Sequence, residues 1–313
     1  MPFGSISRTI LDMSNLQKSI YLTLSYFNLF DYPLSKDELF SWLFKPESVD
    51  DFDKQVEELL KKEKIEHRDG FYFLPGRQGT AHTRKERHSI SLRKIRKARF
   101  IACLLRLVPG LRMIAICSNL GYFNADHNAD IDFFIVAKPG KIWTVRFWST
   151  FLMKILGQRP SKKRIKNKIC LSYYVTSDNL NLEDTKVGNP DIHLTYLVSQ
   201  YLPIYDQDNT WQKFCQANVW LNKYLPNFDF DRITKKYCLS PFLLFVKKIV
   251  ESSVASFEEG FYRKIQKKIM PKSLRTAAQR GDNKVIINDK MLKLHLNDKR
   301  EEYNRKLKDF YAG

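Results

Sequence analysis

Residues 116–138, ICSNLGYFNADHNADIDFFIVAK, place two aspartates, Asp130 and Asp132, on either side of an isoleucine at the start of an apolar run. Side chains at positions i and i+2 of a strand point to the same face, so both carboxylates would face one way while Ile131 faces the core. Two like charges about 5–7 Å apart repel unless a cation lies between them, and Mg²⁺ takes carboxylate oxygens together with substrate phosphates. The stretch therefore predicts a divalent-metal site at the mouth of a buried strand.

The residues around this tripeptide favour the metal site over a plainer explanation, in which the carboxylates only bond to turn amides. Residues 111–119, LRMIAICSN, have the pattern of a buried strand, and residues 130–138, DIDFFIVAK, have the pattern of a second one. The polar loop LGYFNADHNA at 120–129 joins them. Both aspartates would then stand where a polar loop meets a buried strand.

The length and composition indicate a globular chain with more than one core. With 313 residues the chain is long enough for two or three domains, and its apolar content of 43% excludes wholesale disorder. The N-terminus lacks a basic segment followed by an apolar run, so we expect no signal peptide. No apolar stretch is long enough for a transmembrane segment.

The cysteines point to a reducing compartment. The chain has five of them, scattered along the sequence, with no C-x-x-C motif and no pairing with the histidines. This pattern predicts neither a zinc site nor a disulfide framework, and it fits a cytoplasmic protein.

The charge is distributed unevenly along the chain. Residues 1–78 hold 10 Lys and Arg against 13 Asp and Glu, a net charge of −3, whereas the remaining residues carry 43 against 21, a net charge of +22. Much of this excess lies in two basic runs at 83–99 and 157–168, which bracket the D-x-D segment. Such runs are often solvated faces, but these would also attract an anionic substrate, RNA included.

The N-terminal 78 residues have the pattern of three helices followed by a hairpin. Apolar residues recur at helical spacing in 17–31 and 49–65, and Ser35 with Glu38 gives the capping-box pattern for a helix between them. Asp69-Gly70 predicts the turn of the hairpin. This set of elements resembles a winged-helix domain.

The third helix of this winged-helix-like domain is acidic. It opens with Asp50, Asp51 and Asp53 and continues with Glu57 and Glu58. Winged helices often contact DNA through their third helix, but a surface that contacts phosphates should be basic. We therefore expect this domain to bind no duplex DNA, and to contact protein or pack on its own chain instead.

The central segment predicts a small α/β unit. Residues 79–108 have the pattern of a basic linker helix, and the two strands around the aspartates follow it. Residues 141–157 predict an amphipathic helix whose aromatic side chains belong to the core, and 168–178 predict another strand. From about residue 190 onward the pattern is mostly helical.

These elements predict an α+β fold in three parts. We expect a winged-helix-like domain at 1–78, a central small mixed-sheet unit with its basic linker helix at 79–189, and a helical C-terminal bundle at 190–313.

The central unit resembles the minimal nucleotidyltransferases of the DNA polymerase beta superfamily. Their signature is Gly-Ser at the end of a strand, a polar loop, and D-x-D about a dozen residues later. Here Ser118 and Asn119 stand at the Gly-Ser position, and NADIDFFIV at 128–136 matches the D-x-D strand. The resemblance implies that Asp130 and Asp132 are catalytic and bind Mg²⁺ or Mn²⁺, while Ser118 and Asn119 bind the phosphates of a nucleoside triphosphate such as ATP.

The chain departs from the family pattern at the third metal-binding acid. Family members carry this acid on the strand after the helix, and the matching position here falls at Ser172 or Tyr173. Asp178 follows five or six residues later, in a TSDN segment whose composition suits an ordinary turn. Asp178 would reach the metals only if its loop folded back.

Two functions of different classes follow from these residues. The first is an enzyme that transfers a nucleoside monophosphate from a nucleoside triphosphate to a hydroxyl group of RNA, a protein or a small molecule. The alternative is a non-catalytic nucleotide- or RNA-binding regulator, in which Ser118-Asn119 and the missing third acid mark a degenerate site. The sequence names neither the base nor the acceptor.

Overall fold

A computed structural model of the chain describes residues 12–46, 49–161, 164–230, 245, 247–249, 251 and 259–307. These residues form a mixed α+β fold built around a six-stranded mixed sheet with the order β6-β3-β4-β5-β8-β7. Strands β4 and β5 are parallel, and the other neighbouring strands of this sheet are antiparallel. The strands are β3 (Leu111–Ile116), β4 (Ile131–Ala137), β5 (Ile169–Thr176), β6 (Leu202–Asp206), β7 (Ile286–Ile287) and β8 (Met291–Lys293).

Both faces of this sheet are covered, which explains the near-continuous apolar runs of β3 and β4. On one face pack α6 (Ile142–Ile155), the C-terminal part of α5 (Gly79–Leu105) and α10 (Glu259–Ile269). On the other face pack α7 (Ile192–Ser199) and α8 (Thr210–Ala217). Short helical segments complete the described chain: α11 (Lys272–Ala278), η2 (Ser118–Leu120), η3 (Glu183–Thr185) and η4 (Val219–Lys223).

The N-terminal elements appear in the predicted order. They are α2 (Asn15–Asn28), α3 (Lys36–Ser41), α4 (Phe52–Lys61), and the hairpin of β1 (Glu66–Arg68) and β2 (Phe71–Phe73). The predicted capping box is confirmed, since Ser35 accepts from Glu38 N and the Glu38 carboxylate accepts from Ser35 N. The predicted turn is also confirmed, because Asp69 and Gly70 both have positive φ, as the tight turn of a two-residue hairpin requires.

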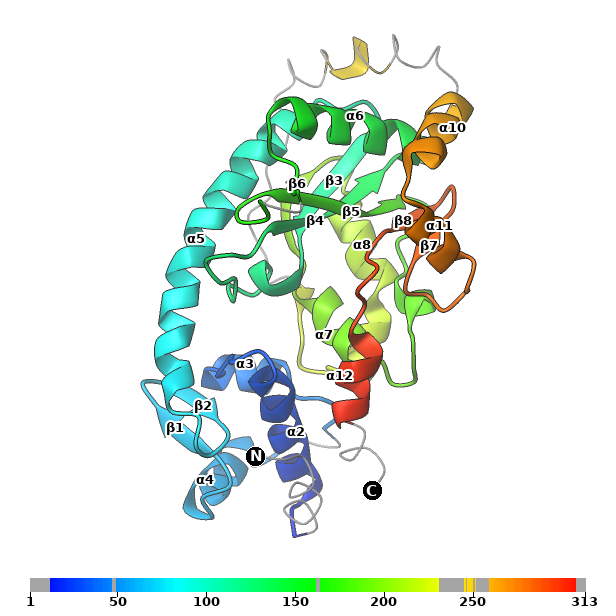
Figure 1. Ribbon diagram of the computed structural model, residues 1–313. Helices are drawn as coiled ribbons and strands as arrows, with labels where there is room; N and C mark the ends of the chain where they lie inside the picture. The colour runs from blue at the N-terminus through cyan, green and yellow to red at the C-terminus, as the bar shows by residue number, and fades with distance from the viewer. Residues whose placement is uncertain are drawn as a thin grey trace.

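The N-terminal elements pack on the rest of the chain rather than standing apart from it. Tyr26 of α2 stacks on Tyr196 of α7 with ring centroids 4.2 Å apart. The same buried cluster includes Leu307 of α12 (Arg300–Leu307). Figure 1 shows α12 beside α2, and it shows α5 running along one side from the β1–β2 hairpin to the sheet. The expectation that this unit packs on its own chain is therefore confirmed.

The region at 190–313 contains helices α7, α8, α10, α11 and α12, as expected, but the expectation that it forms a separate bundle is wrong. Strand β6 pairs with β3, and β8 pairs with β5, so strands from beyond residue 190 complete the central sheet on both sides. These strands are two to five residues long and lie between helices, so their periodicity is too short to separate from the helical pattern around them. Residues 231–258 of the expected helical region lie largely outside the described residues.

The prediction that the aromatic residues of α6 belong to the core holds for most of them. Trp143 is fully buried, and Phe147 and Trp148 are partly buried against the core. Phe151, by contrast, is 46% exposed, and the aliphatic Ile155 near the end of the same helix is 65% exposed. No helix among the described residues is long and apolar enough to cross a membrane.

The capping box gives a test of how the N-terminal unit is stabilised. Replacing Ser35 by alanine removes the oxygen that accepts from Glu38 N, and we expect the free energy of unfolding to fall by about 1 kcal/mol in urea denaturation. Ser35→Thr retains the oxygen and serves as the control. Equal stability of the alanine and threonine variants would contradict a capping role.

Candidate functional site

The two aspartates stand at the entry to β4, with Asp132 in the strand and Asp130 immediately before it. Ile131 is fully buried against the α6 side of the sheet, whereas Phe134 packs on the α7 side. Since Asp132 lies two residues before Phe134, strand alternation places it on the α7 side. Both aspartates are half-buried. Ile131 is therefore in the core, as expected, and Asp132 is on the opposite face, while Asp130 lies one residue before the strand.

Ser118 and Asn119 lie beside Asp132 because β3 and β4 are antiparallel. The backbone N–H of Cys117, just after β3, donates to the Asp132 carbonyl oxygen at 3.1 Å. Ser118 then takes a left-handed backbone with φ of 57° and starts the short turn η2. The Tyr122 hydroxyl donates to Asn119 Oδ1 at 2.8 Å, which orients the Asn119 amide. The structure thus brings all four predicted site residues to one end of neighbouring strands.

The loop between the two strands is fixed by the basic helix α5. The buried Lys94 ammonium donates to Ala129 O at 2.7 Å, Asn167 Oδ1 at 2.6 Å and His127 O at 3.3 Å. Ser91 Oγ accepts from Ala125 N at 3.0 Å. Part of the basic run at 83–99 therefore points inward and holds the residues that precede Asp130.

The electrostatics of the aspartate pair favour a bound cation. Burial, reinforced by repulsion from Asp132, raises the pKa of Asp130 from its ordinary value of 3.8 to about 6. The positive charge of Lys94 acts in the opposite direction but does not cancel these effects. A divalent ion between the two carboxylates would offset the cost of keeping both ionised.

Where the resemblance predicts a third acid, the structure has the Cys170 thiol, the Ser172 hydroxyl and the His295 imidazole. In the β4–β5 register, Cys170 lies opposite Asp132. Ser172 Oγ lies 3.2 Å from Cys170 Sγ and 2.5 Å from Nε2 of His295, which follows β8. Ligand atoms of Asp132, Cys170 and His295 all lie within 4.8 Å of one another. Sequence analysis missed this group because Cys170 and His295 are far apart in the chain and meet only when β8 joins β5.

Asp178 cannot serve as the third metal ligand. It is an exposed residue in the turn after β5, two residues beyond Thr176. Thr176 pairs with Ala137 at the far end of β4, whereas Cys170 pairs with Asp132 at the near end. Six residues of strand separate those ends, a distance of about 20 Å. The possibility that the loop folds back is therefore excluded, and the turn interpretation of Asp178 is confirmed.

A cavity of about 290 Å³ lies beside Ser118 and Asn119 on the α7 side of the sheet, and neither aspartate is among its lining residues. Ser118, Asn119 and His295 contribute to its wall. Its other lining residues come from α2 and the turn after it, the loop after β3, strands β5 and β8, α7 and the residues after it, and the segment around α12: Tyr26, Phe30, Cys117, Tyr122, Tyr173, His193, Leu197, Gln200, Tyr201, Lys293, Asn297, Asp298, Lys299, Arg300 and Tyr303.

Two polar groups of residues that line this cavity have no hydrogen-bond partner among the residues that the structure describes. They are the hydroxyl of Tyr201 and the amide nitrogen of Gln200, and both side chains are buried. A buried polar group without a partner is costly, by about 1–3 kcal/mol. Such groups beside a cavity are the arrangement expected of a site that hydrogen-bonds a polar ligand.

The charged residues of the cavity wall are mostly neutralised by one another. Lys293 Nζ lies 2.7 Å from Asp298, and Arg300 contacts both Asp298 and Asp191. Burial alone would raise the pKa of Asp298, but hydrogen bonds from Arg300 and the charge of Lys293 lower it well below its ordinary value. Lys299 adds an exposed positive charge to the wall. The cavity thus combines polar groups with a small surplus of positive charge.

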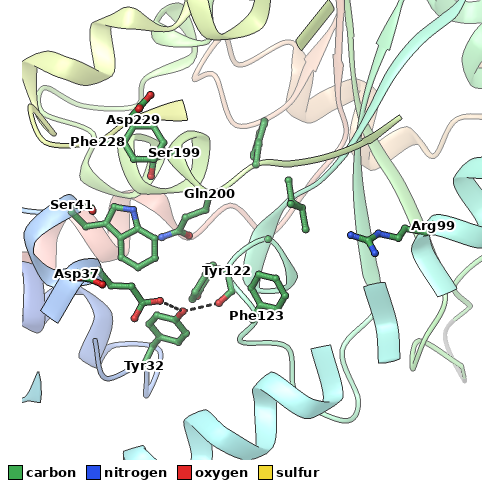
Figure 2. A pocket seen from close by; sticks show the side chains of 15 residues that line it. Tyr32, Asp37, Ser41, Arg99, Tyr122, Phe123, Ser199, Gln200, Phe228 and Asp229 are labelled. Carbon is green, nitrogen blue, oxygen red and sulfur yellow. Dashed lines mark hydrogen bonds between the residues drawn. The ribbon is translucent and has the colours of Figure 1, made fainter. Parts of the chain in front are cut away.

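A second cavity, of about 460 Å³, lies between α3 and the loop that follows Ser118. Its walls are largely aromatic, and Figure 2 shows Tyr32 donating to Glu38 and to the Tyr122 carbonyl oxygen at its edge. Arg99 of α5 reaches it from the opposite side (Figure 2). Tyr122, Gln200 and Tyr201 line both cavities, so one wall serves the two spaces. No sequence motif marked this second cavity.

The loop after Ser118 packs closely against the end of α7 at Gly121. A Cβ atom on Gly121 would lie 2.3 Å from the Gln200 carbonyl oxygen, so only glycine lets the loop after Ser118 approach the end of α7 this closely.

Comparison of the chain with protein-family models, with curated proteins and with solved structures found no match in any of the three.

Lys94 gives a stability test of the loop that carries Asp130. In Lys94→Met, three oxygen acceptors lose a buried donor, and we expect the free energy of unfolding in urea to fall by about 2 kcal/mol. The matched control is Arg96→Met, because Arg96 lies on the exposed side of the same helix. A lysine variant as stable as this control would contradict the structural role of Lys94.

Asp130 gives a pH test without any ligand. Between its ordinary pKa of 3.8 and the folded value of about 6, the folded chain holds a proton that the unfolded chain releases. Asp130 therefore makes the free energy of unfolding fall as the pH rises through this window. Asp130→Asn should flatten that part of the curve in urea titrations at stepped pH, whereas Asp178→Asn should leave it unchanged. A wild-type slope in Asp130→Asn would contradict the raised pKa.

Proposed function

We propose that this chain is a metal-dependent nucleotidyltransferase that moves a nucleoside monophosphate from a nucleoside triphosphate to a hydroxyl acceptor. One observation carries the proposal: Ser118-Asn119 and the aspartate pair meet at one end of β3 and β4, joined by the bond from Cys117 N to Asp132 O. Within this proposal the sheet is the nucleotidyltransferase unit and the N-terminal elements are a winged-helix-like domain.

The four residues divide the chemistry between them. Ser118 and Asn119 each have a side-chain donor that can hydrogen-bond the β- and γ-phosphates. Asp130 and Asp132 would hold Mg²⁺ or Mn²⁺ through their carboxylate oxygens. When bound, such ions neutralise the phosphates and align the attacking and leaving oxygens. The local fold supports this role for Ser118, because its left-handed backbone is one that favours glycine, the residue type expected there from the resemblance.

The cavity beside Ser118 favours a small polar ligand. Its volume of about 290 Å³ suits a nucleoside or a small hydroxyl-bearing acceptor. The Tyr201 hydroxyl and the Gln200 amide nitrogen, which lack a partner among the described residues, would hydrogen-bond that molecule. RNA and protein acceptors remain within the proposal, with only their reacting end inside the cavity.

The N-terminal unit supports a role within the site rather than on duplex DNA. Tyr26 and Phe30 of this unit line the first cavity, and Tyr32 and Trp42 line the second. Its acidic α4 lacks the positive surface that phosphate contacts need. We infer that this unit closes the cavities against α7 and α12.

The second candidate is a nucleotide- or RNA-binding regulator without turnover. The observation in its favour is the absence of an acid at Ser172 and Tyr173, together with the position of Asp178 at the other end of the strands. In that case, Asp130 and Asp132 would still bind metal and nucleotide, but no hydroxyl would be activated.

Nucleotide binding tests the proposal first. Asp130→Asn and Asp132→Asn should each abolish Mg²⁺-dependent binding of a triphosphate in calorimetric titrations, because each removes one of the carboxylates that hold the ion. Asp178→Asn is the control and should bind as the wild type does. Triphosphate binding that survives both site variants would refute the metal site.

Turnover separates the two candidates. The wild type is incubated with each α-labelled triphosphate, Mg²⁺ or Mn²⁺, and pools of RNA, protein and small molecules. Label transferred by the wild type and lost in Asp132→Asn supports the enzyme. Nucleotide binding with no labelled acceptor in any pool supports the regulator.

A further inference from the structure

Three neighbouring strands bring a mixed set of metal-binding side chains to one point. Asp132 comes from β4, Cys170 from β5, and His295 from the segment just after β8. One ligand atom from each lies within 4.8 Å of the other two. All three side chains are half-buried, and of the three His295 lines the cavity beside Ser118.

The donor types decide which metal suits this group. Mg²⁺ prefers oxygen ligands in an octahedral arrangement, and a thiol with an imidazole offers it little. Zn²⁺ accepts thiolate, imidazole and carboxylate ligands together, and three protein ligands with an open fourth position are the usual form of its catalytic sites. The group therefore differs in chemistry from the aspartate pair, although Asp132 belongs to both.

The hydroxyl of Ser172 already holds the two softer ligands side by side. It lies 3.2 Å from the Cys170 sulfur and 2.5 Å from Nε2 of His295. Metal-binding histidines are commonly oriented by a hydrogen bond on the ring nitrogen that does not bind the metal. While Nε2 of His295 keeps its bond to Ser172, Nδ1 would therefore be the nitrogen that binds the ion. Only modest movement is needed to bring the three ligand atoms to the roughly 2.0–2.3 Å distances of a zinc ion.

We propose that Asp132, Cys170 and His295 bind one Zn²⁺ ion and leave it an open fourth coordination position. On binding, the Cys170 thiol releases its proton to solvent and the thiolate bonds to the ion. The role of this ion rests on the proposed function: it would hold the acceptor hydroxyl where family enzymes use a third carboxylate. A zinc ion lowers the pKa of a hydroxyl group or water that it binds, and the deprotonated oxygen attacks a phosphate more readily.

The site is tested by metal binding in the absence of nucleotide. The full chain is stripped with a chelator, titrated with Zn²⁺ in a competition assay, and its metal content is measured after desalting. We expect one equivalent of zinc. Titration with Co²⁺ should produce the charge-transfer absorption of a cobalt–thiolate bond, which reports Cys170 directly.

Variants with matched controls identify the ligands. Cys170→Ser should abolish the cobalt–thiolate absorption, and His295→Gln should weaken zinc binding by at least about tenfold. The controls are Cys103→Ser and His82→Gln, two exposed residues of α5, and both should bind as the wild type does. Circular dichroism establishes that each variant is folded, and the two site variants test the ligands independently.

The outcomes separate this site from the proposed function. Substoichiometric zinc in the wild type, or tight zinc with an unchanged cobalt spectrum in both site variants, would overturn the zinc site. Mg²⁺-dependent triphosphate binding could still stand in that case. Conversely, one equivalent of zinc that needs Cys170 and His295, in a chain that binds no triphosphate, would support the zinc site and reject the nucleotidyltransferase.

Discussion

Two carboxylates lie at the edge of a sheet that is buried on both faces, and much of the surrounding structure depends on this constraint. Ile131 and the residues after Asp132 are almost completely buried, so the aspartates have only the end of β4 on which to remain partly hydrated. Burial already raises the pKa of Asp130 to about 6. The surrounding structure therefore has to hold the strand end in place while both aspartates stay half-buried.

Long-range contacts supply that rigidity. The ammonium group of Lys94 gathers backbone and side-chain oxygens from the loop before Asp130 and from the segment before β5. On the other side of the site, Asp191 caps α7 and contacts Arg300 of α12, which joins the C-terminal segment to the sheet. Lys94, Asp191 and Arg300 have charged side chains, which usually lie at the surface, but here they are buried and connect separate segments of the chain.

The cavities arise from the meeting of segments that are distant in the sequence. The N-terminal helices provide aromatic walls, the loop after β3 provides Ser118 and Asn119, and the C-terminal segment provides His295 and Lys299. The Tyr201 hydroxyl and the Gln200 amide nitrogen, which have no partner among the described residues, belong to residues that line both cavities. This geometry explains why a C-terminal segment of only a few strand residues matters to the site.

The sequence alone determined the local elements and the motif that they carry. Capping residues placed α3, the Asp-Gly pair placed the β1–β2 turn, and apolar runs placed β3, β4 and β5, because these signals depend on neighbours within a few positions. The two aspartates could be selected in the same way, whereas Ser118 and Asn119 were selected through the resemblance to a known family. Only the tertiary structure decided that β6 and β8 complete the sheet, that Asp178 lies at the far end, and that Cys170 meets His295. Strand pairing between distant segments set those outcomes, and no local spacing records it.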